Sequence, residues 1–161
     1  MKQKDRVTLK GQVVTRAGPE APQKLQLFDG RFDTGYRITK FVIYPKEVDN
    51  TTVNIFMAKL GISPNIGDAR DFNWQDNREV AWASTAFDAN GISMSGTIDL
   101  PTDYDSIVIE DLYLYSWEVA TGAAVDLNYF IELERVELTD AMGAVTMSSY
   151  KASRSGQSWI P

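Results

Sequence analysis

A chain of 161 residues with 43% hydrophobic residues has the length and composition of one folded domain with a sizeable core. Cysteine and histidine are both absent, which excludes disulfides, Ser-His-Asp or Cys-His catalysis, and metal sites built on either residue. The net charge of −6 is uneven, because residues 1–50 are basic and residues 51–138 are strongly acidic. An acidic body repels phosphate backbones, so we expect nucleic-acid binding nowhere except through the basic N-terminal segment.

Short runs of β-branched and aromatic residues alternate with Gly, Pro, Asn and Asp clusters, which is the pattern of an all-β protein. The connections are too short for the crossover helices of a parallel sheet. We therefore predict an antiparallel β-sandwich of about eight strands, jelly-roll-like in topology. The predicted strands cover residues 6–14, 24–28, 36–44, 52–59, 79–86, 92–100, 106–117 and 126–138.

The segment after the last predicted strand favours one short C-terminal helix. Thr139 suits the N-cap, Asp140 suits the helix dipole, and Met142, Val145 and Tyr150 can share one apolar side. No run is long and apolar enough for a membrane span, and the N-terminus lacks the apolar region of a secretory signal, so we expect a soluble chain.

The two ends of the chain differ in character from its body. We assign residues 1–10 to an N-terminal basic arm, residues 11–151 to a single sandwich domain and residues 152–161 to a C-terminal tail. The arm either solubilises the chain or contacts an acidic partner, and the tail packs on its own domain or on a neighbour. The terminal residues that we predict to lie at an interface are Lys2, Lys4, Arg6 and Trp159.

The run "VIEDLYLYSWE" places Tyr113, Tyr115 and Trp117 at every second position. Strict alternation would bury a carboxylate, so we predict a bulge at residues 110–111 that shifts the period. The predicted core side is Ile107, Ile109, Leu112 and Leu114, and the predicted outer side is Val108, Glu110, Tyr113, Tyr115 and Trp117. A lone domain would leave these rings in water, so we predict that the aromatic row contacts a partner, and a protein rather than a sugar.

Two further tryptophans lie in "FNWQDNREVAWAS". Trp82 has small neighbours in a predicted strand and is expected in the core. Trp74 lies among amides in a polar loop, where local packing, a protein interface and stacking on a sugar all remain open.

Clusters of carboxylates supply the remaining chemical candidates. Asp99, Asp103 and Asp105 lie in one loop and could begin a calcium site, although the spacing is not that of an EF-hand and a solvated turn explains it more simply. Asp68, Asp71 and Asp76 in "GDARDFNWQDN" invite the same two interpretations. "FDGRFDTG" leads into a strand and not into a helix, so it is no phosphate loop. We therefore expect no catalytic residues, no metal ligands and no cofactor.

Three segments carry a resemblance: "LFDGRFDTGYRITKFVIYP", "FNWQDNREVAWAS" and "NYFIELERVELTDAMGAV". In this order and at similar separations they resemble short β-rich virion proteins of marine bacteriophages and environmental viruses. The resemblance covers about Leu25 to Val145 and rests on packing and turn motifs.

The resemblance implies a non-enzymatic capsid component, a small jelly-roll protein that builds, cements or decorates a shell. Its implied partners are copies of itself and other capsid proteins, and its implied location is the virion, after synthesis in the host cytoplasm. The alternative from a different class is a carbohydrate-binding or receptor-binding β-sandwich module.

Overall fold

The computed structural model describes residues 6–18, 21–27, 34–48, 51–66, 70–94, 100–103 and 105–138. Within these ranges the chain is all-β, with seven strands in two antiparallel sheets and no helix. The described part therefore contains no helix of the length and apolarity that a membrane crossing requires. The strands are β1 (Arg6–Val14), β2 (Gln23–Leu25), β3 (Thr34–Pro45), β4 (Asn54–Gly61), β5 (Glu79–Phe87), β6 (Leu112–Glu118) and β7 (Asp126–Glu137).

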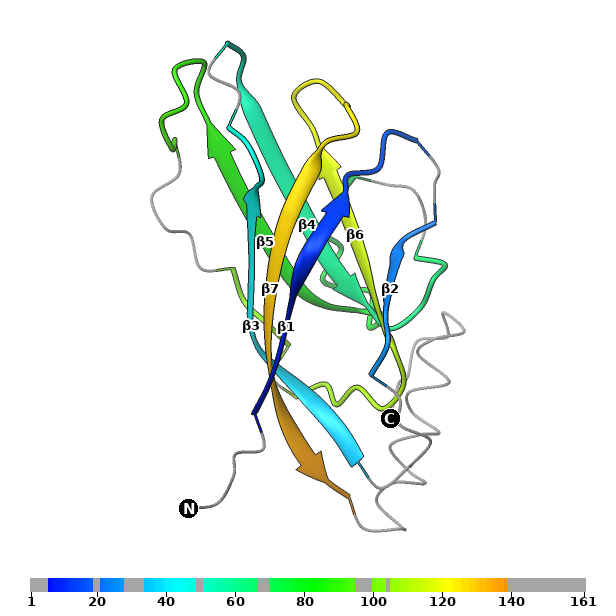
Figure 1. The fold of residues 1–161 in the computed structure, drawn as a ribbon. Helices are drawn as coiled ribbons and strands as arrows, with labels where there is room; N and C mark the ends of the chain where they lie inside the picture. Colours follow the sequence, from blue (N-terminus) through cyan, green and yellow to red (C-terminus); the bar gives the residue numbers. More distant parts are fainter. Residues whose placement is uncertain are drawn as a thin grey trace.

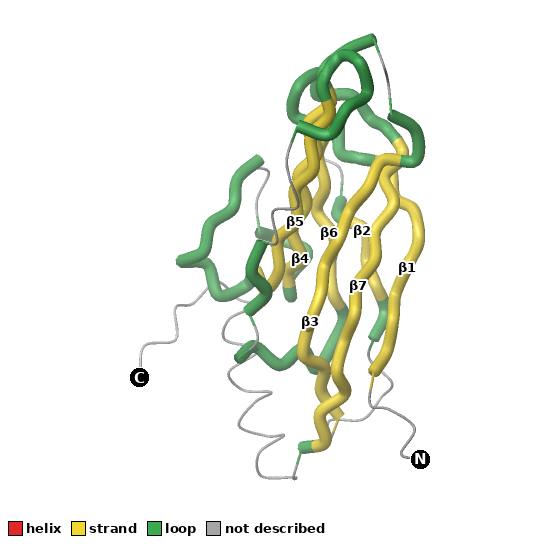
Figure 2. The backbone as a smooth tube through the Cα atoms, turned by 90° about the vertical axis from the view of Figure 1, so that its left-hand side faces the viewer, coloured by secondary structure: helices red, strands yellow, loops and turns green. Residues whose placement is uncertain are grey.

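The two sheets have the strand orders β1-β7-β3 and β2-β6-β4-β5. Figure 1 shows the three-stranded sheet in front of the four-stranded one, and Figure 2 shows the same two layers from the side. Only β4 and β5 follow each other in the chain and pair with each other. The sandwich is thus tied together by strands far apart in the sequence, such as β1 with β7.

The core lies between the sheets and follows the two-residue period of the strands. In β7, Leu127, Ile131 and Leu133 are completely buried, while Asn128, Phe130 and Glu132 alternate with the inward positions and lie on the other face. The four-stranded sheet contributes Leu60 and Leu114, each almost fully buried. This alternation explains why sequence periodicity located the strands.

Tyr129 of β7 lies across the edge strand β1 at Gly11, its paired residue. A Cβ atom at Gly11 would stand 2.7 Å from the Tyr129 hydroxyl oxygen, so no larger residue fits beneath the ring without a shift. The glycine leaves room for an aromatic ring that covers the backbone of an edge strand. On the opposite edge, the ring of Tyr44 packs edge-on against Phe87 at 5.4 Å and links β3 to β5.

The connection between β6 and β7 is organised by the buried carboxylate of Glu118. It accepts hydrogen bonds from the backbone N–H groups of Ile55, Ala120 and Thr121 at 3.2, 3.0 and 2.8 Å, and from the Thr121 hydroxyl. Gly122 follows with φ of 72°, a conformation that favours glycine. Burial alone would raise the pKa of Glu118, but the hydrogen bonds from Thr121, Ile55 and Ala120 outweigh it and hold this pKa below its ordinary value.

Seven of the eight predicted strands are present, and the bounds of β1 match the prediction. The predicted strand at 92–100 is not among them: its described residues form one isolated bridge, between Ser93 and Phe87, and residues 95–99 lie outside the described ranges. The predicted strand at 106–117 begins only at Leu112.

The predicted bulge at residues 110–111 is a break before β6. Asp111 accepts a hydrogen bond from the Leu27 backbone N–H at 3.0 Å and pairs with Lys24 at 3.2 Å, so its carboxylate anchors the segment around β2. The predicted outward position of Val108 is wrong, because Val108 is completely buried in the main core and bridges to Tyr36 of β3.

Several predictions fall outside the described residues: the C-terminal helix from Thr139, the tail at 152–161, and Lys2, Lys4 and Trp159. Arg6 is described, and with the residues up to Lys10 it belongs to β1 and not to a free arm. Its guanidinium lies 3.3 Å from the Glu132 carboxylate of the neighbouring strand.

The depressed pKa of Glu118 predicts a specific loss of stability in acid. Because the folded pKa lies below the ordinary value of 4.5, the stabilisation is fully present above that pH and is lost as the pH falls through the folded pKa. We expect Glu118→Gln to lower the free energy of unfolding at pH 7 and to reduce its further fall in acid. Urea unfolding followed by fluorescence from pH 7 to pH 3 measures both. The same pH dependence in the variant as in the parent would contradict this role of Glu118.

Candidate binding site

Both faces of β6 are buried, and they face different surroundings. Leu112 and Leu114 face the main core between the sheets. Tyr113, Tyr115 and Trp117 form a separate cluster, and their exposed fractions are only 9%, 1% and 1%. The separation of an aliphatic from an aromatic side is confirmed, but the prediction that the rings lie in water is wrong. These three residues offer no surface to a partner, because their own chain covers them.

The cover is the segment after β4. Gly61 leaves room for it, since a Cβ atom there would stand 2.0 Å from Cδ1 of Ile66, which packs on the aromatic cluster. The Tyr115 hydroxyl donates to the Ser63 carbonyl at 2.7 Å and accepts from the Ile66 backbone N–H at 3.3 Å. Burial raises the pKa of Tyr115, so the hydroxyl keeps the proton that it donates.

Two buried cations lie on the aromatic cluster. The Arg16 guanidinium lies 5.3 Å from the Tyr115 ring centre and 5.7 Å from that of Trp117. The Lys59 ammonium lies 5.6 Å from the Trp117 ring centre. The Arg16 backbone N–H donates to the Ser116 carbonyl at 2.9 Å, which brings the chain from the end of β1 across to the second sheet. Cation–π attraction is stronger where water is excluded, so these contacts stabilise the two buried cations on the aromatic cluster.

The same Lys59 forms a buried ion pair with Glu79 of the next strand. The Nζ to Oε2 distance is 3.0 Å, and the two residues are 1% and 2% exposed. The other oxygen, Oε1, accepts from the Trp82 indole N–H at 2.9 Å and from the Asn73 backbone N–H at 3.0 Å. Lys59 also donates to the Asp71 carbonyl at 3.0 Å. The pair therefore fixes the backbone at residues 71 and 73 to the outer face of the sheet.

Trp74 follows directly in this loop and is 62% exposed. The inner side of its ring packs on Trp82, with the ring centres 5.6 Å apart and the planes inclined at 55°. The loop then turns, because the Asn73 side-chain oxygen accepts from the Gln75 backbone N–H at 3.2 Å. Trp82 is buried, as predicted, whereas Trp74 is exposed.

Asp76 closes the loop by pairing with Arg78 at 2.7 Å. The hydrogen bonds from the Arg78 side chain hold the pKa of Asp76 below its ordinary value. Asp71 thus contacts Lys59 and Asp76 contacts Arg78 within this loop. Asp103 accepts from the Ser106 hydroxyl at 2.6 Å, Asp105 is exposed, and Asp99 lies outside the described ranges. In the described part of the chain, no three acidic side chains gather as metal ligands would.

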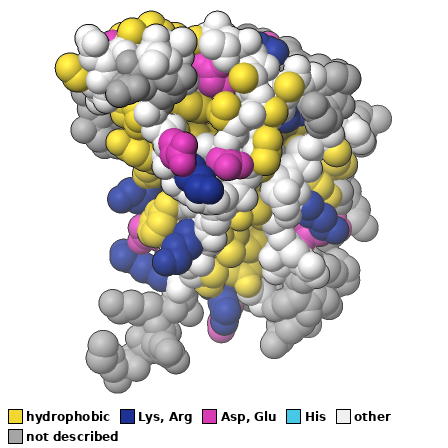
Figure 3. Space-filling view, turned by 45° about the horizontal axis from the view of Figure 1, so that its top comes forward, with side chains coloured by type: hydrophobic (Ala, Val, Ile, Leu, Met, Phe, Trp, Pro, Cys, Tyr) yellow, Lys and Arg dark blue, Asp and Glu magenta, His cyan; other side chains and the backbone are white. Residues whose placement is uncertain are grey.

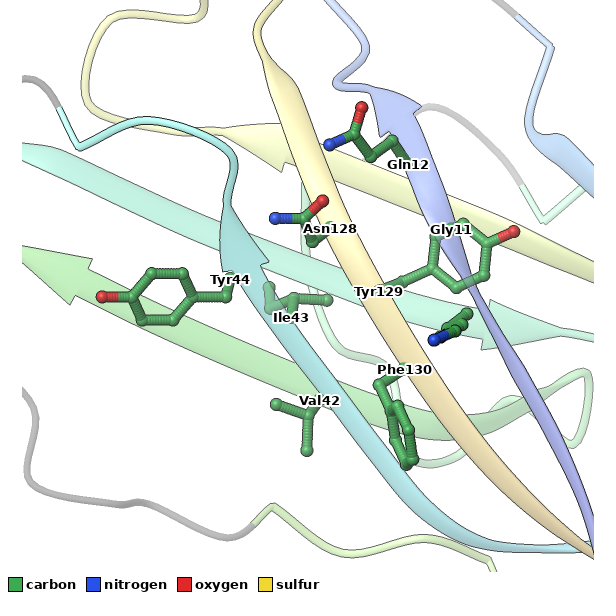
Figure 4. Close-up of a pocket in the computed structure, with 9 residues that line it drawn as sticks. Gly11, Gln12, Val42, Ile43, Tyr44, Asn128, Tyr129 and Phe130 are labelled. Carbon is green, nitrogen blue, oxygen red and sulfur yellow. The ribbon is translucent and has the colours of Figure 1, made fainter.

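A second candidate surface is the outer face of the β1-β7-β3 sheet. Phe130 pairs with Val42 on one side and with Lys10 on the other, and Phe130 and Val42 are 37% and 41% exposed. Figure 4 shows the side chains of Phe130 and Val42 pointing the same way. They line a hollow of about 440 Å³. Figure 3 shows hydrophobic side chains down the middle of this view with Lys and Arg on either side. The Lys40 ammonium lies 6.0 Å from the Phe130 ring centre.

No family model matches this chain. No curated protein matches it either. Two surfaces of the molecule are candidate binding sites: the Trp74 loop over one sheet and the exposed apolar face of the other.

Sequence reasoning missed Lys59 and Glu79. A signal was present, because "NIFMAKLG" carries a lysine within an otherwise uncharged strand. A charge at such a position is buried only when it is paired, but its partner lies 20 residues away and cannot be chosen from the sequence.

Breaking the ion pair tests its structural role. Glu79→Gln retains the shape of the side chain but leaves the Lys59 charge buried without its counter-charge, so we expect a loss of about 3 to 5 kcal/mol in the free energy of unfolding. The double variant Lys59→Met, Glu79→Gln removes both charges and should recover at least about 1 kcal/mol of that loss. Urea unfolding of the parent, both single variants and the double variant measures the coupling. Additive single effects would contradict a direct interaction.

Proposed function

We propose that this chain is a non-enzymatic virion structural protein, a capsid or capsid-decorating subunit that assembles with copies of itself or docks onto other capsid proteins. The observation that carries the proposal is the exposed apolar face of the β1-β7-β3 sheet. In this proposal the protein is made in the host cytoplasm and is then located in the virion.

The exposed face has the composition of a protein contact. Phe130 and Val42 are paired on adjacent strands and are 37% and 41% exposed, and Val14, which is 57% exposed, lies further along the same face at the position paired with Asp126. Arg6 and Lys40 lie on the same face. An apolar centre with a charged rim is the usual anatomy of an interface, and arginine is tolerated there better than most charges. A partner that covers the face would remove these side chains from water.

The pairing of the strands supports a jelly roll, which is a fold of many capsid proteins. A jelly roll is a long hairpin rolled up, so the first strand pairs with the last, the second with the one before the last, and the middle two with each other. Here β1 pairs with β7, β2 with β6 and β4 with β5. We assign the remaining place, beside β3, to the segment around Val108, which exchanges two hydrogen bonds of 2.8 Å with Tyr36.

The roles of the buried carboxylates favour a structural protein over an enzyme. Glu79 pairs with a lysine and holds a loop, and Glu118 accepts backbone N–H groups at a turn. Asp111, which is only partly buried, accepts from the Leu27 backbone N–H and pairs with Lys24. Each of these carboxylates forms contacts that stabilise the fold, whereas a general acid or base needs access to a substrate.

The assembly face can be tested with one charge. Phe130→Glu places a carboxylate at the centre of the face, and we expect it to weaken self-association at least about tenfold, which corresponds to about 1.4 kcal/mol. Light scattering after size-exclusion chromatography over a range of concentrations, together with electron micrographs, measures the assembly. Ile92→Glu is the matched control, because Ile92 is 62% exposed but lies in the turn after β5.

Two results would overturn the proposal. The first is a parent chain that assembles in neither experiment and also fails to bind capsid particles. The second is a Phe130→Glu variant that assembles as well as the Ile92→Glu control.

A further inference from the structure

The loop that carries Trp74 has the features of a ligand platform. We propose that this loop, residues 71–78, binds a neutral carbohydrate chain, with the exposed side of the Trp74 ring stacked on a pyranose. Trp74 has the largest exposed fraction of any aromatic residue in the described ranges. Such a ring presents a flat apolar surface that matches the C–H face of a sugar.

One side of the Trp74 ring contacts a buried aromatic residue. Trp82 occupies the space beneath it at 5.6 Å and is only 6% exposed. The Trp82 indole N–H is in turn bonded to Glu79 at 2.9 Å. Trp74 therefore lies on a fixed base, and its outer side remains available to a ligand.

The backbone on the N-terminal side of Trp74 is fixed as well. The Asn73 N–H is bonded to Glu79, and the Asp71 carbonyl is bonded to Lys59. Burying an ion pair costs desolvation energy that a pair of apolar residues would not. In return, the loop is ordered before a ligand arrives, and less conformational entropy is lost on binding.

The surroundings of Trp74 suit a sugar better than a protein. Its neighbours Asn73, Gln75 and Asn77 are exposed, and amides both donate to and accept from hydroxyl groups. Among the described residues of the loop, Trp74 is the one large hydrophobic side chain that is exposed. The residues that contribute most to protein–protein binding cluster with one another at the centre of an interface. A single exposed ring surrounded by polar side chains does not form such a cluster.

The net charge of the chain favours a neutral ligand over an anionic one. The Asp71 side chain is 60% exposed, and the chain has a net charge of −6. Anionic polysaccharides would be repelled, whereas neutral chains would not. The loop covers the β2-β6-β4-β5 sheet, so the site lies apart from the proposed assembly face on the other sheet, and either proposal can fail without the other.

Native affinity electrophoresis tests the site with defined probes. We expect the parent protein to be retarded in a gel that contains hydroxyethyl cellulose, mixed-linkage β-glucan, xylan or galactomannan, and not in one that contains polygalacturonate. Trp74→Ala should weaken the retardation at least about tenfold, and Trp74→Phe should retain part of it. Ile92→Ala removes an equally exposed side chain elsewhere and should bind as the parent does.

Three results would overturn the inference. The first is no retardation in any neutral gel, and the second is equal retardation of Trp74→Ala and the parent. The third is a Trp74→Ala protein that changes its oligomeric mass in light scattering while sugar binding is absent, which would assign Trp74 to a protein contact. Unfolding curves for each variant separate a lost platform from a lost fold.

Discussion

The buried ion pair between Lys59 and Glu79 is the interaction on which the outer layer of this protein depends. It joins two adjacent strands of one sheet, and its remaining hydrogen-bonding groups reach up to the backbone of the loop above. Each charge is stable in this buried position only because the other one is present. The loop in turn is held on the sheet by its hydrogen bonds to the pair. The Lys59 ammonium also lies 5.6 Å from the Trp117 ring centre, so the ion pair contacts the aromatic cluster as well as the loop.

This cover makes the molecule more than a two-layer sandwich. The main core lies between the sheets, and a second cluster of Tyr113, Tyr115 and Trp117 lies outside the four-stranded sheet, beneath the segment after β4. The three-stranded sheet has no such layer over Val42 and Phe130 in the described part of the chain. In the described part of the chain the two outer faces therefore differ: one is covered and carries the exposed Trp74, and the other exposes Val42 and Phe130.

The sequence predicted what local periodicity determines, and missed what distant contacts determine. Alternation located seven strands and separated Leu112 and Leu114 from the aromatic side of β6. It could not show that Ile66 folds back over Gly61, because a loop's path depends on contacts absent from the strand pattern. The aromatic row therefore looked like an interface when it is a covered cluster. Trp74 could be singled out because a tryptophan among amides is conspicuous, but the charges that hold it lie in two strands and come together only in the fold.

Hydrogen exchange at the Asn73 backbone amide tests the central claim most directly, since that N–H donates to Glu79 at 3.0 Å and lies just before the exposed Trp74. If the ion pair holds the loop on the sheet, this amide is protected to nearly the same extent as amides in the centre of β4, because both open only when the sheet does. Exchange at the rate of an unstructured loop, with the β4 amides still protected, would contradict the account.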